Sequence, residues 1–97
     1  MYTVVRNYKI KEGAFDQLVQ SLHEGFLTII SSVPGFVAYY FVNTGKDTVV
    51  TVSIFEDQGG AYQSIAAAAA WIKEHVSTLV EGPPTIMAGD TPISLTK

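Results

Sequence analysis

The chain has 97 residues, the size of one domain, and we expect residues 1–97 to form a single unit. Hydrophobic residues make up 47% of it and charged residues only 15%, with a net charge of −3 and no basic cluster, which excludes a nucleic-acid-binding surface. The absence of cysteine excludes disulfides, thiolate metal sites and thiol catalysis. No apolar run reaches the ~18 residues of a membrane span, and the first predicted strand leaves no room for a signal peptide, so we expect a cytoplasmic protein with no membrane partner.

The chain begins with a predicted strand and a long helix. Tyr2–Ile10 is rich in β-branched and aromatic residues, as strands are. Apolar residues then recur at three- and four-residue spacing from Phe15 to Val33, which predicts a helix of about twenty residues with Gly13 as its cap. Because glycine destabilises a helix interior by about 1 kcal/mol relative to alanine, Gly25 predicts a close contact at that point.

Residues 34–55 predict a β-hairpin that turns at Asn43–Asp47, where Gly45 can adopt positive φ. Both faces of its strands are apolar, whereas a hairpin exposed on one side would alternate apolar and polar residues. In the first strand, alternation predicts Phe36, Ala38, Tyr40 and Val42 on one face and Val37, Tyr39 and Phe41 on the other.

The second half of the chain predicts another helix and a last strand. Asp57 is the expected N-cap of the helix, and Gly82 with the prolines that follow is its expected end. Residues 85–95 predict a last strand that is bent or broken near Gly89 and Pro92. The order β-α-β-β-α-β predicts an α+β, ferredoxin-like fold, an antiparallel four-stranded sheet with two helices on one face. Since the other face is also apolar, we expect a homodimer formed sheet against sheet.

Several short segments resemble a known family. "VVRNY", "EGF" ahead of "PGFVAYY", "FEDQGGAYQS" and "AAWI" occur in the order seen in antibiotic biosynthesis monooxygenase-like domains of the dimeric α+β barrel superfamily. The resemblance runs over nearly the whole chain and is closest to the uncharacterised members. It implies a cofactor-independent monooxygenase that acts on a small aromatic or quinol-type molecule. The family also includes haem-degrading enzymes, which are a further alternative.

The resemblance also implies site residues. In the polyketide-type monooxygenases, the positions of an Asn and a Trp fall at Thr51 and Phe55 here, and that of a Tyr falls one residue from Tyr62. These substitutions remove two of the three polar groups of that mechanism. The haem-degrading members have an Asn that matches Asn7 and a His that falls beside His75.

The residues themselves allow two interpretations of each candidate. Trp71 and His75 are four apart on the second helix, so they form either a pocket wall with a base or a core anchor with a helix-end residue. Arg6 and Asn7 point to opposite faces of the first strand, so one of them faces the helices. Tyr40 either stacks on a planar ligand or packs in the sheet.

We therefore expect a cavity between sheet and helices, with no cofactor and no metal, because two distant histidines without cysteine provide no set of metal ligands. The alternative to an enzyme is a non-catalytic dimeric domain that binds a small molecule or serves as a scaffold. The expected catalytic residues are His75, Asn7 and Tyr62, and the expected substrate-binding residues are Trp71, Phe55, Thr51 and Tyr40.

Overall fold

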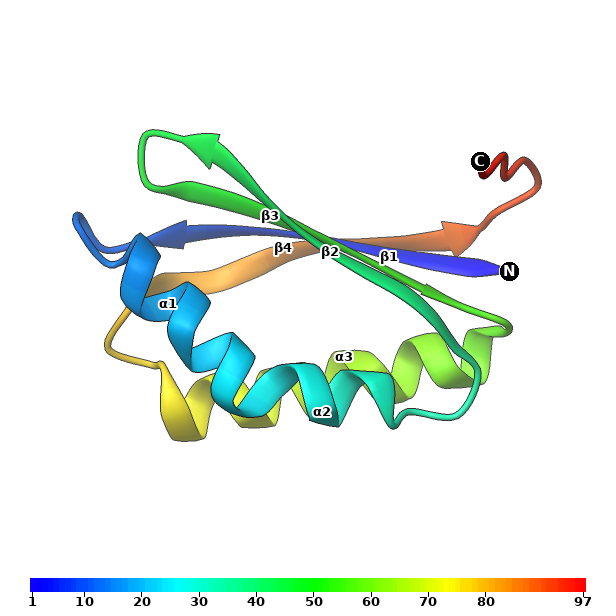
Figure 1. Cartoon of the computed structure of the whole chain (residues 1–97), viewed down its shortest axis with the longest axis horizontal. Helices are drawn as coiled ribbons and strands as arrows, with labels where there is room; N and C mark the ends of the chain where they lie inside the picture. The colour runs from blue at the N-terminus through cyan, green and yellow to red at the C-terminus, as the bar shows by residue number, and fades with distance from the viewer.

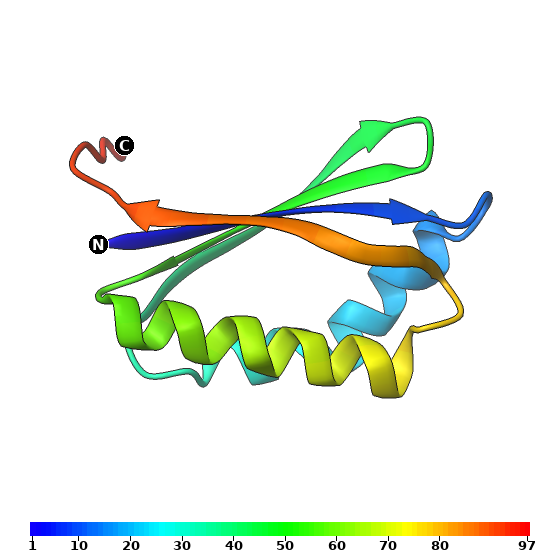
Figure 2. The ribbon, with the colours of Figure 1, turned by 180° about the vertical axis from the view of Figure 1, so that it is seen from behind.

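The computed structural model describes residues 1–97 as one antiparallel sheet with every helix on the same side of it (Figure 1). Figure 2 shows the same two layers from behind, with the long last helix lying along the sheet. The predicted β-α-β-β-α-β order and ferredoxin-like fold are confirmed. In spatial order β2-β3-β1-β4, the strands are β1 (Tyr2–Ile10), β2 (Phe36–Gly45), β3 (Thr48–Phe55) and β4 (Val80–Asp90).

The helical layer contains a π-helical turn in the middle of the predicted first helix. Because this turn carries one extra residue per hydrogen-bonded ring, it changes which side chains face the sheet, and such turns often occur at functional sites. The helix begins after Ala14 rather than at Gly13, which takes a φ of +77° in the preceding turn. In chain order, the helical segments are α1 (Phe15–Ser21), the π-helical turn (Leu22–Phe26), α2 (Leu27–Ser31) and α3 (Gln58–His75).

The start of α3 is held in place by a cap and a close contact. The predicted N-cap is confirmed, since the Asp57 carboxylate accepts a hydrogen bond from the Gly60 backbone N–H at 3.0 Å. Gly60 lies so close to the segment before β2 that a Cβ there would be 2.5 Å from the Pro34 carbonyl oxygen. A side chain at this position would therefore push α3 away from the sheet.

The end of α3 differs from the prediction. The helix ends at His75, and β4 begins at Val80, so Gly82 and its prolines lie in a strand and do not end the helix. β4 is an edge strand, and its register against β1 is irregular between the pairs Lys9–Glu81 and Asn7–Thr85. Prolines are tolerated at such a position because no ladder N–H is required there. The strand ends at Asp90, between Gly89 and Pro92, where the sequence predicts a bend or break.

The hairpin has an irregularity that strict alternation does not predict. Phe36 pairs with Phe55 and Ala38 pairs with Ile54, so Val37 is an extra residue in β2. Phe36 therefore packs on Phe55 on the helix side, with ring centroids 6.0 Å apart, and does not share a face with Ala38 and Tyr40 as predicted.

The sheet face away from the helices is uncovered and apolar. Tyr40 is 56% exposed and Met87 64% exposed. Val50, Val52 and Ile54 of β3 are partly buried on the same face, between β2 and β1. The apolar second face that the sequence predicts is therefore present and has no cover from this chain.

Candidate functional site

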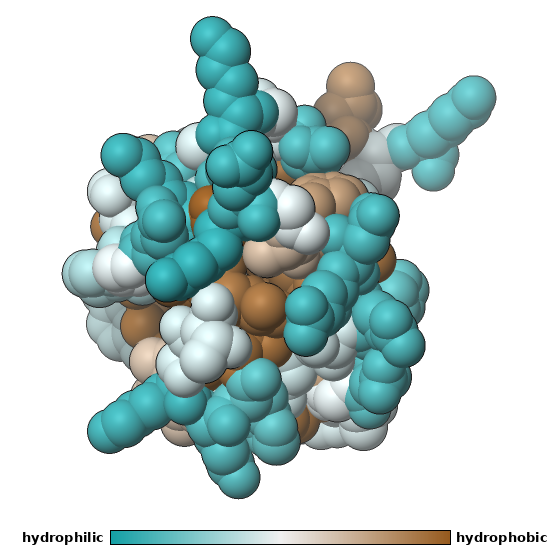
Figure 3. Space-filling view, turned by 90° about the vertical axis from the view of Figure 1, so that its left-hand side faces the viewer, coloured by the Kyte–Doolittle hydropathy of each residue, from teal (hydrophilic) through white to brown (hydrophobic).

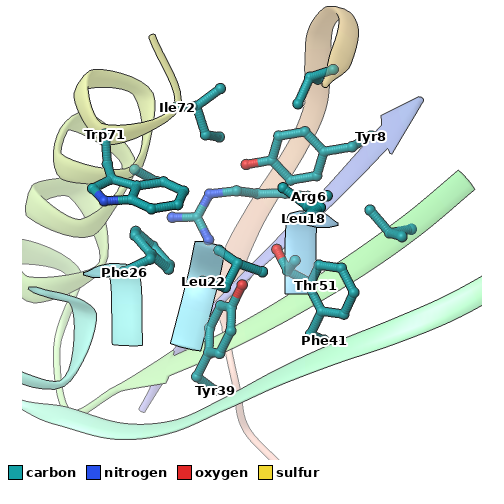
Figure 4. A pocket seen from close by; sticks show the side chains of 13 residues that line it. Arg6, Tyr8, Leu18, Leu22, Phe26, Tyr39, Phe41, Thr51, Trp71 and Ile72 are labelled. Carbon is teal, nitrogen blue, oxygen red and sulfur yellow. The ribbon is translucent and has the colours of Figure 1, made fainter. Parts of the chain in front are cut away.

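An apolar cavity of about 30 Å³ lies between the sheet and the helices. Hydrophobic residues make up 11 of its 13 lining residues, and the lining comes from every strand, from α1, from the π-helical turn and from α3. Three aromatic side chains, Phe26, Trp71 and Tyr39, form one wall of the cavity (Figure 4). The ring centroid of Phe26 lies 5.3 Å from that of Trp71 and 5.7 Å from that of Tyr39. A flat ring is the shape that such a wall contacts best.

Gly25 makes room for this wall. A Cβ at Gly25 would be 3.1 Å from Nε1 of Trp71, so the glycine in the π-helical turn allows the indole to lie against the first helix. The close contact predicted from the sequence is therefore confirmed.

One charged side chain lies within the apolar lining. Arg6 of β1 is 2% exposed, and its side chain points to the helix side, as do those of Val4 and Tyr8. Figure 4 shows its guanidinium at the centre of the cavity wall beside Trp71. Nη1 donates to Ser53 Oγ at 3.0 Å and Nη2 donates to Ser64 Oγ at 3.2 Å.

Some of the polar atoms around the cavity have no partner. Nε of Arg6 and Oγ1 of Thr51 are buried and make no hydrogen bond. No salt bridge involves Arg6, although a buried cation is normally paired with a carboxylate. Burial lowers the pKa of Arg6, yet a guanidinium stays charged at neutral pH. The cavity thus contains an uncompensated positive charge and free donors.

The hydroxyl groups of Tyr8 and Tyr39 are further polar groups in the lining. Burial raises the pKa of Tyr8, and the nearby Arg6 charge partly opposes this. Burial also raises the pKa of Tyr39, to which the proximity of Tyr8 contributes. Both side chains are therefore neutral O–H donors at neutral pH and are too weakly acidic to act as bases there.

A larger groove of about 430 Å³ runs between α3 and β4 and shares part of the cavity wall. Residues common to both include Arg6, Tyr8 and Ala68. The small side chains of Ala68 and Ala69 on α3 leave this space open, and Lys73 lines it further along the helix. In Figure 3, the end of the molecule where α3 ends shows apolar side chains framed by hydrophilic ones. The groove gives a ligand a route to Arg6 from solvent.

Of the expected site residues, Trp71 and Thr51 line the cavity. His75 lies next to it, with its ring centroid 5.3 Å from that of Trp71, but its side chain is 50% exposed. Phe55 is fully buried against Phe36 and lines neither the cavity nor the groove.

The other expected residues lie elsewhere. Asn7 and Tyr40 are exposed on the sheet face away from the helices. Tyr62 is exposed on the first half of α3, where its hydroxyl accepts from Gln58 at 2.9 Å and lies 3.4 Å from that of Tyr2. These hydrogen bonds lower the pKa of Tyr62. The structure therefore does not bring these three residues to the cavity.

Sequence reasoning missed Arg6, Tyr8 and Tyr39 as parts of one site. A signal for Arg6 is present in the first strand, where Val4, Arg6 and Tyr8 alternate with polar or smaller residues. Strand periodicity assigns Arg6 to the same face as its large apolar neighbours and therefore to the core. No local pattern indicates that Tyr39 of the distant hairpin lies beside it.

Comparison with known proteins identifies the family. The sequence model described as antibiotic biosynthesis monooxygenase matches residues 1–74. The chain belongs to this family. No curated protein is similar enough in sequence to match it. None of the helices is long and apolar enough to cross a membrane, and no three His, Cys, Asp or Glu side chains are grouped as metal ligands.

Solved structures share the fold of this family member at low sequence identity. A protein of unknown function from Nitrosomonas europaea is 20% identical with a TM-score of 0.82, over 99% of this chain and 93% of that one. A monooxygenase of Streptomyces coelicolor, solved with the ligand nanaomycin D, is 21% identical with a TM-score of 0.74, over 99% and 91%. A Mycobacterium tuberculosis protein is 11% identical with a TM-score of 0.74, over 98% of both chains.

Proposed function

We propose that this protein is a cofactor-independent monooxygenase that acts on a small aromatic molecule of the phenol, quinol or anthrone type. The observation that carries the proposal is the apolar, aromatic wall of Phe26, Trp71 and Tyr39 in a chain of the monooxygenase family. The adjoining groove, at about 430 Å³, lies within the ~300–1,000 Å³ range of small-ligand sites.

The reaction that we propose needs no external reductant. An anthrone-type substrate loses a proton, and the resulting electron-rich anion transfers electrons to dioxygen. One oxygen atom replaces the two hydrogens of the ring CH₂ as a carbonyl, and the other leaves as water. All four electrons come from the substrate, so atoms and charge balance without a metal, flavin or haem. The protein's part is to position the ring, assist deprotonation and exclude water.

The proposed site consists of Trp71 and Thr51, which line the cavity, and His75, which lies beside it. Trp71 and Thr51 contact the substrate, and His75, whose ring packs at a tilt against that of Trp71, accepts the proton. Asn7 and Tyr62 lie away from the cavity and are matched control positions.

The test is oxygen uptake with anthrone, with the product identified as anthraquinone. With ¹⁸O₂, one labelled oxygen should appear in the product. We expect His75→Ala to reduce kcat/KM by about a hundredfold or more, the lower range for loss of a general base, and Trp71→Ala to reduce it because the ring loses a contact that positions it. Asn7→Ala and Tyr62→Phe should leave it unchanged. Uptake no faster than in a protein-free solution would overturn the proposed function, and uptake equal in all four variants would overturn the site.

A second candidate is a non-catalytic domain that binds a small molecule. The observation that favours it is the small volume of the cavity, about 30 Å³, which leaves little room for a substrate between sheet and helices. This function predicts that an aromatic ligand binds with 1:1 stoichiometry while no anthrone is oxidised.

We further propose that two copies pair through the uncovered sheet face. The exposed apolar side chains of Tyr40 and Met87 on that face support this, because water contact disfavours such a surface by about 25 cal/mol per Å². Tyr40→Glu should convert a dimer to a monomer in light scattering. Tyr62, 51% exposed against 56% for Tyr40, is the matched control, and Tyr62→Glu should leave the dimer intact. A wild-type mass of one chain would refute the pairing.

A further inference from the structure

The charge of Arg6 has no counter-ion within the chain. Its two hydrogen-bond acceptors, Ser53 and Ser64, are neutral hydroxyls. Ser64 donates its own proton to the Ala61 carbonyl at 2.6 Å, so it can only accept from Arg6. The Nε–H has no acceptor within the chain, and because the side chain is only 2% exposed it has almost no contact with water. A buried charge held in this way is destabilising unless something outside the chain pairs with it.

The surroundings of Arg6 have one sign of charge. The only charged side chains that line the cavity or the groove are Arg6 and Lys73, with no Asp, Glu or His in either lining. The chain as a whole has nine acidic residues against six basic ones. The positive lining is therefore not a property of the general surface, and it attracts an anion.

Neutral donors lie beside the guanidinium. Thr51, the cross-strand partner of Arg6, has a buried hydroxyl that makes no hydrogen bond of normal geometry, although it lies near enough to the Tyr39 phenol to oppose the rise in its pKa. The phenols of Tyr8 and Tyr39 line the same cavity and remain protonated because burial raises the pKa of each. An oxygen anion at this point would find a charged N–H and a free O–H, the donor set that oxyanions bind most strongly.

The volumes of the cavity and of the groove fit two different parts of one ligand. The cavity of about 30 Å³ suits a small group such as an oxygen substituent, and the groove of about 430 Å³, which shares part of its wall, accommodates the ring. Arg6 and Tyr8 belong to both walls, so a substituent that extends from a ring in the groove reaches the guanidinium.

We propose that Arg6, with Thr51, forms a binding site for an oxyanion carried by a flat aromatic ring that lies in the groove between α3 and β4. The shared chemistry is an aryl-attached anionic oxygen, either a phenolate or a carboxylate. The choice of an aromatic ligand rests on the proposed function. The charge at the site binds the ionised form of a phenol and so makes its deprotonation easier.

The test measures binding of three nitroaromatics that share one ring: 4-nitrobenzoate, 4-nitrophenol and neutral 4-nitrobenzyl alcohol. Trp71 is the only tryptophan and lines the cavity, so quenching of its fluorescence reports occupancy. We expect 4-nitrobenzoate or 4-nitrophenolate to bind at least about tenfold more tightly than the alcohol, as one hydrogen bond to a charged group provides. The anion that binds more tightly distinguishes a carboxylate ligand from a phenolate ligand.

Three variants distinguish the contribution of Arg6 from that of positive charge in general. Arg6→Met should reduce the preference for an anion to about twofold or less, and Arg6→Lys should restore part of it. Lys73→Met removes the same charge at the groove and should keep most of the preference. A second readout needs no variant: the absorbance of bound 4-nitrophenol should show that it ionises about one pH unit or more below the free phenol.

Equal binding of the three ligands to the wild-type protein, with no shift in the ionisation of 4-nitrophenol, would overturn this inference. It would mean that Arg6 is paired with water and not with a ligand anion. A preference for the anion that Arg6→Met leaves unchanged would also overturn it. The proposed function fails separately. If the protein binds the anions but does not oxidise anthrone, the proposed function is refuted and the oxyanion site is supported. If it oxidises anthrone but shows no preference for an anion, the oxyanion site is refuted and the proposed function is supported.

Discussion

Arg6→Met tests whether Arg6 is present for binding or for stability. Methionine has a similar length and fills the cavity wall without a charge. If Arg6 belonged to a buried ion pair, removing it would reduce the free energy of unfolding by about 3–5 kcal/mol, because a charge would be left unpaired. No carboxylate pairs with Arg6, so this term is absent.

The remaining contributions of this substitution to the free energy of unfolding have opposite signs. The substitution removes two hydrogen bonds to serine hydroxyls, each worth about 1.5–3 kcal/mol because the donor is charged. It also relieves the burial of the guanidinium, a penalty of several kcal/mol. Ser64 keeps its bond to Ala61, whereas Ser53, fully buried, loses its partner. We therefore expect a net change within about 2 kcal/mol of zero.

The assay is urea unfolding followed by circular dichroism at one fixed protein concentration, which keeps any contribution of dimerisation constant. The double variant Arg6→Met/Ser53→Ala is the matched control and should regain about 1 kcal/mol, because it removes the orphaned hydroxyl. A loss of more than about 3 kcal/mol in Arg6→Met, not recovered in the double variant, would show that Arg6 holds the fold together and would refute this reasoning.

Further substitutions test the packing around the site. Gly60→Ala should reduce the free energy of unfolding by about 1–3 kcal/mol, because its Cβ would be 2.5 Å from a backbone carbonyl oxygen. Gly59→Ala is the matched control and should be neutral or stabilising, because the nearest atom to its Cβ would be 3.4 Å away. Equal effects of the two substitutions in urea unfolding would contradict the close contact at Gly60. Gly25→Ala should displace the Trp71 indole, seen as a changed near-UV circular dichroism signal, and an unchanged spectrum would count against that contact. The raised pKa of Tyr39 means that the unfolded chain ionises first, so stability present below about pH 10 is lost above it by up to ~1.4 kcal/mol per pH unit. Tyr39→Phe should make this alkaline loss shallower, and an identical pH profile of the urea midpoint would show that Tyr39 does not contribute.

Much of the architecture could be predicted because the signals for it are local. The alternation in residues 2–10 and the three- and four-residue spacing in residues 15–33 and 61–76 are properties of single elements. The order of those elements then permits few folds, since crossovers are right-handed and strands that follow one another pair readily. The apolar second face of the hairpin was also evident, because its strands contain so few polar positions.

The errors in the fold occur where pairing with a distant strand outweighs local preference. Gly82 and its prolines have the composition of a helix end, but β1 provides a partner strand from residue 80 onward, and the irregular register accommodates the missing N–H groups. Val37 becomes an extra residue only because Phe36 pairs with Phe55. Neither register can be read from the segment that contains it.

The sequence by itself therefore determined the order of elements, the two-layer fold and the alternation of side chains along each strand, but it left open whether Arg6 or Asn7 faces the helices, and it assigned Phe36 to the wrong face. Only the tertiary structure decided which residues share a cavity, since Arg6, Tyr39 and Trp71 come from β1, β2 and α3 and meet through packing. Periodicity specifies the direction of a side chain, but not what lies opposite it. An unpaired charge can be recognised only once every possible partner has a position.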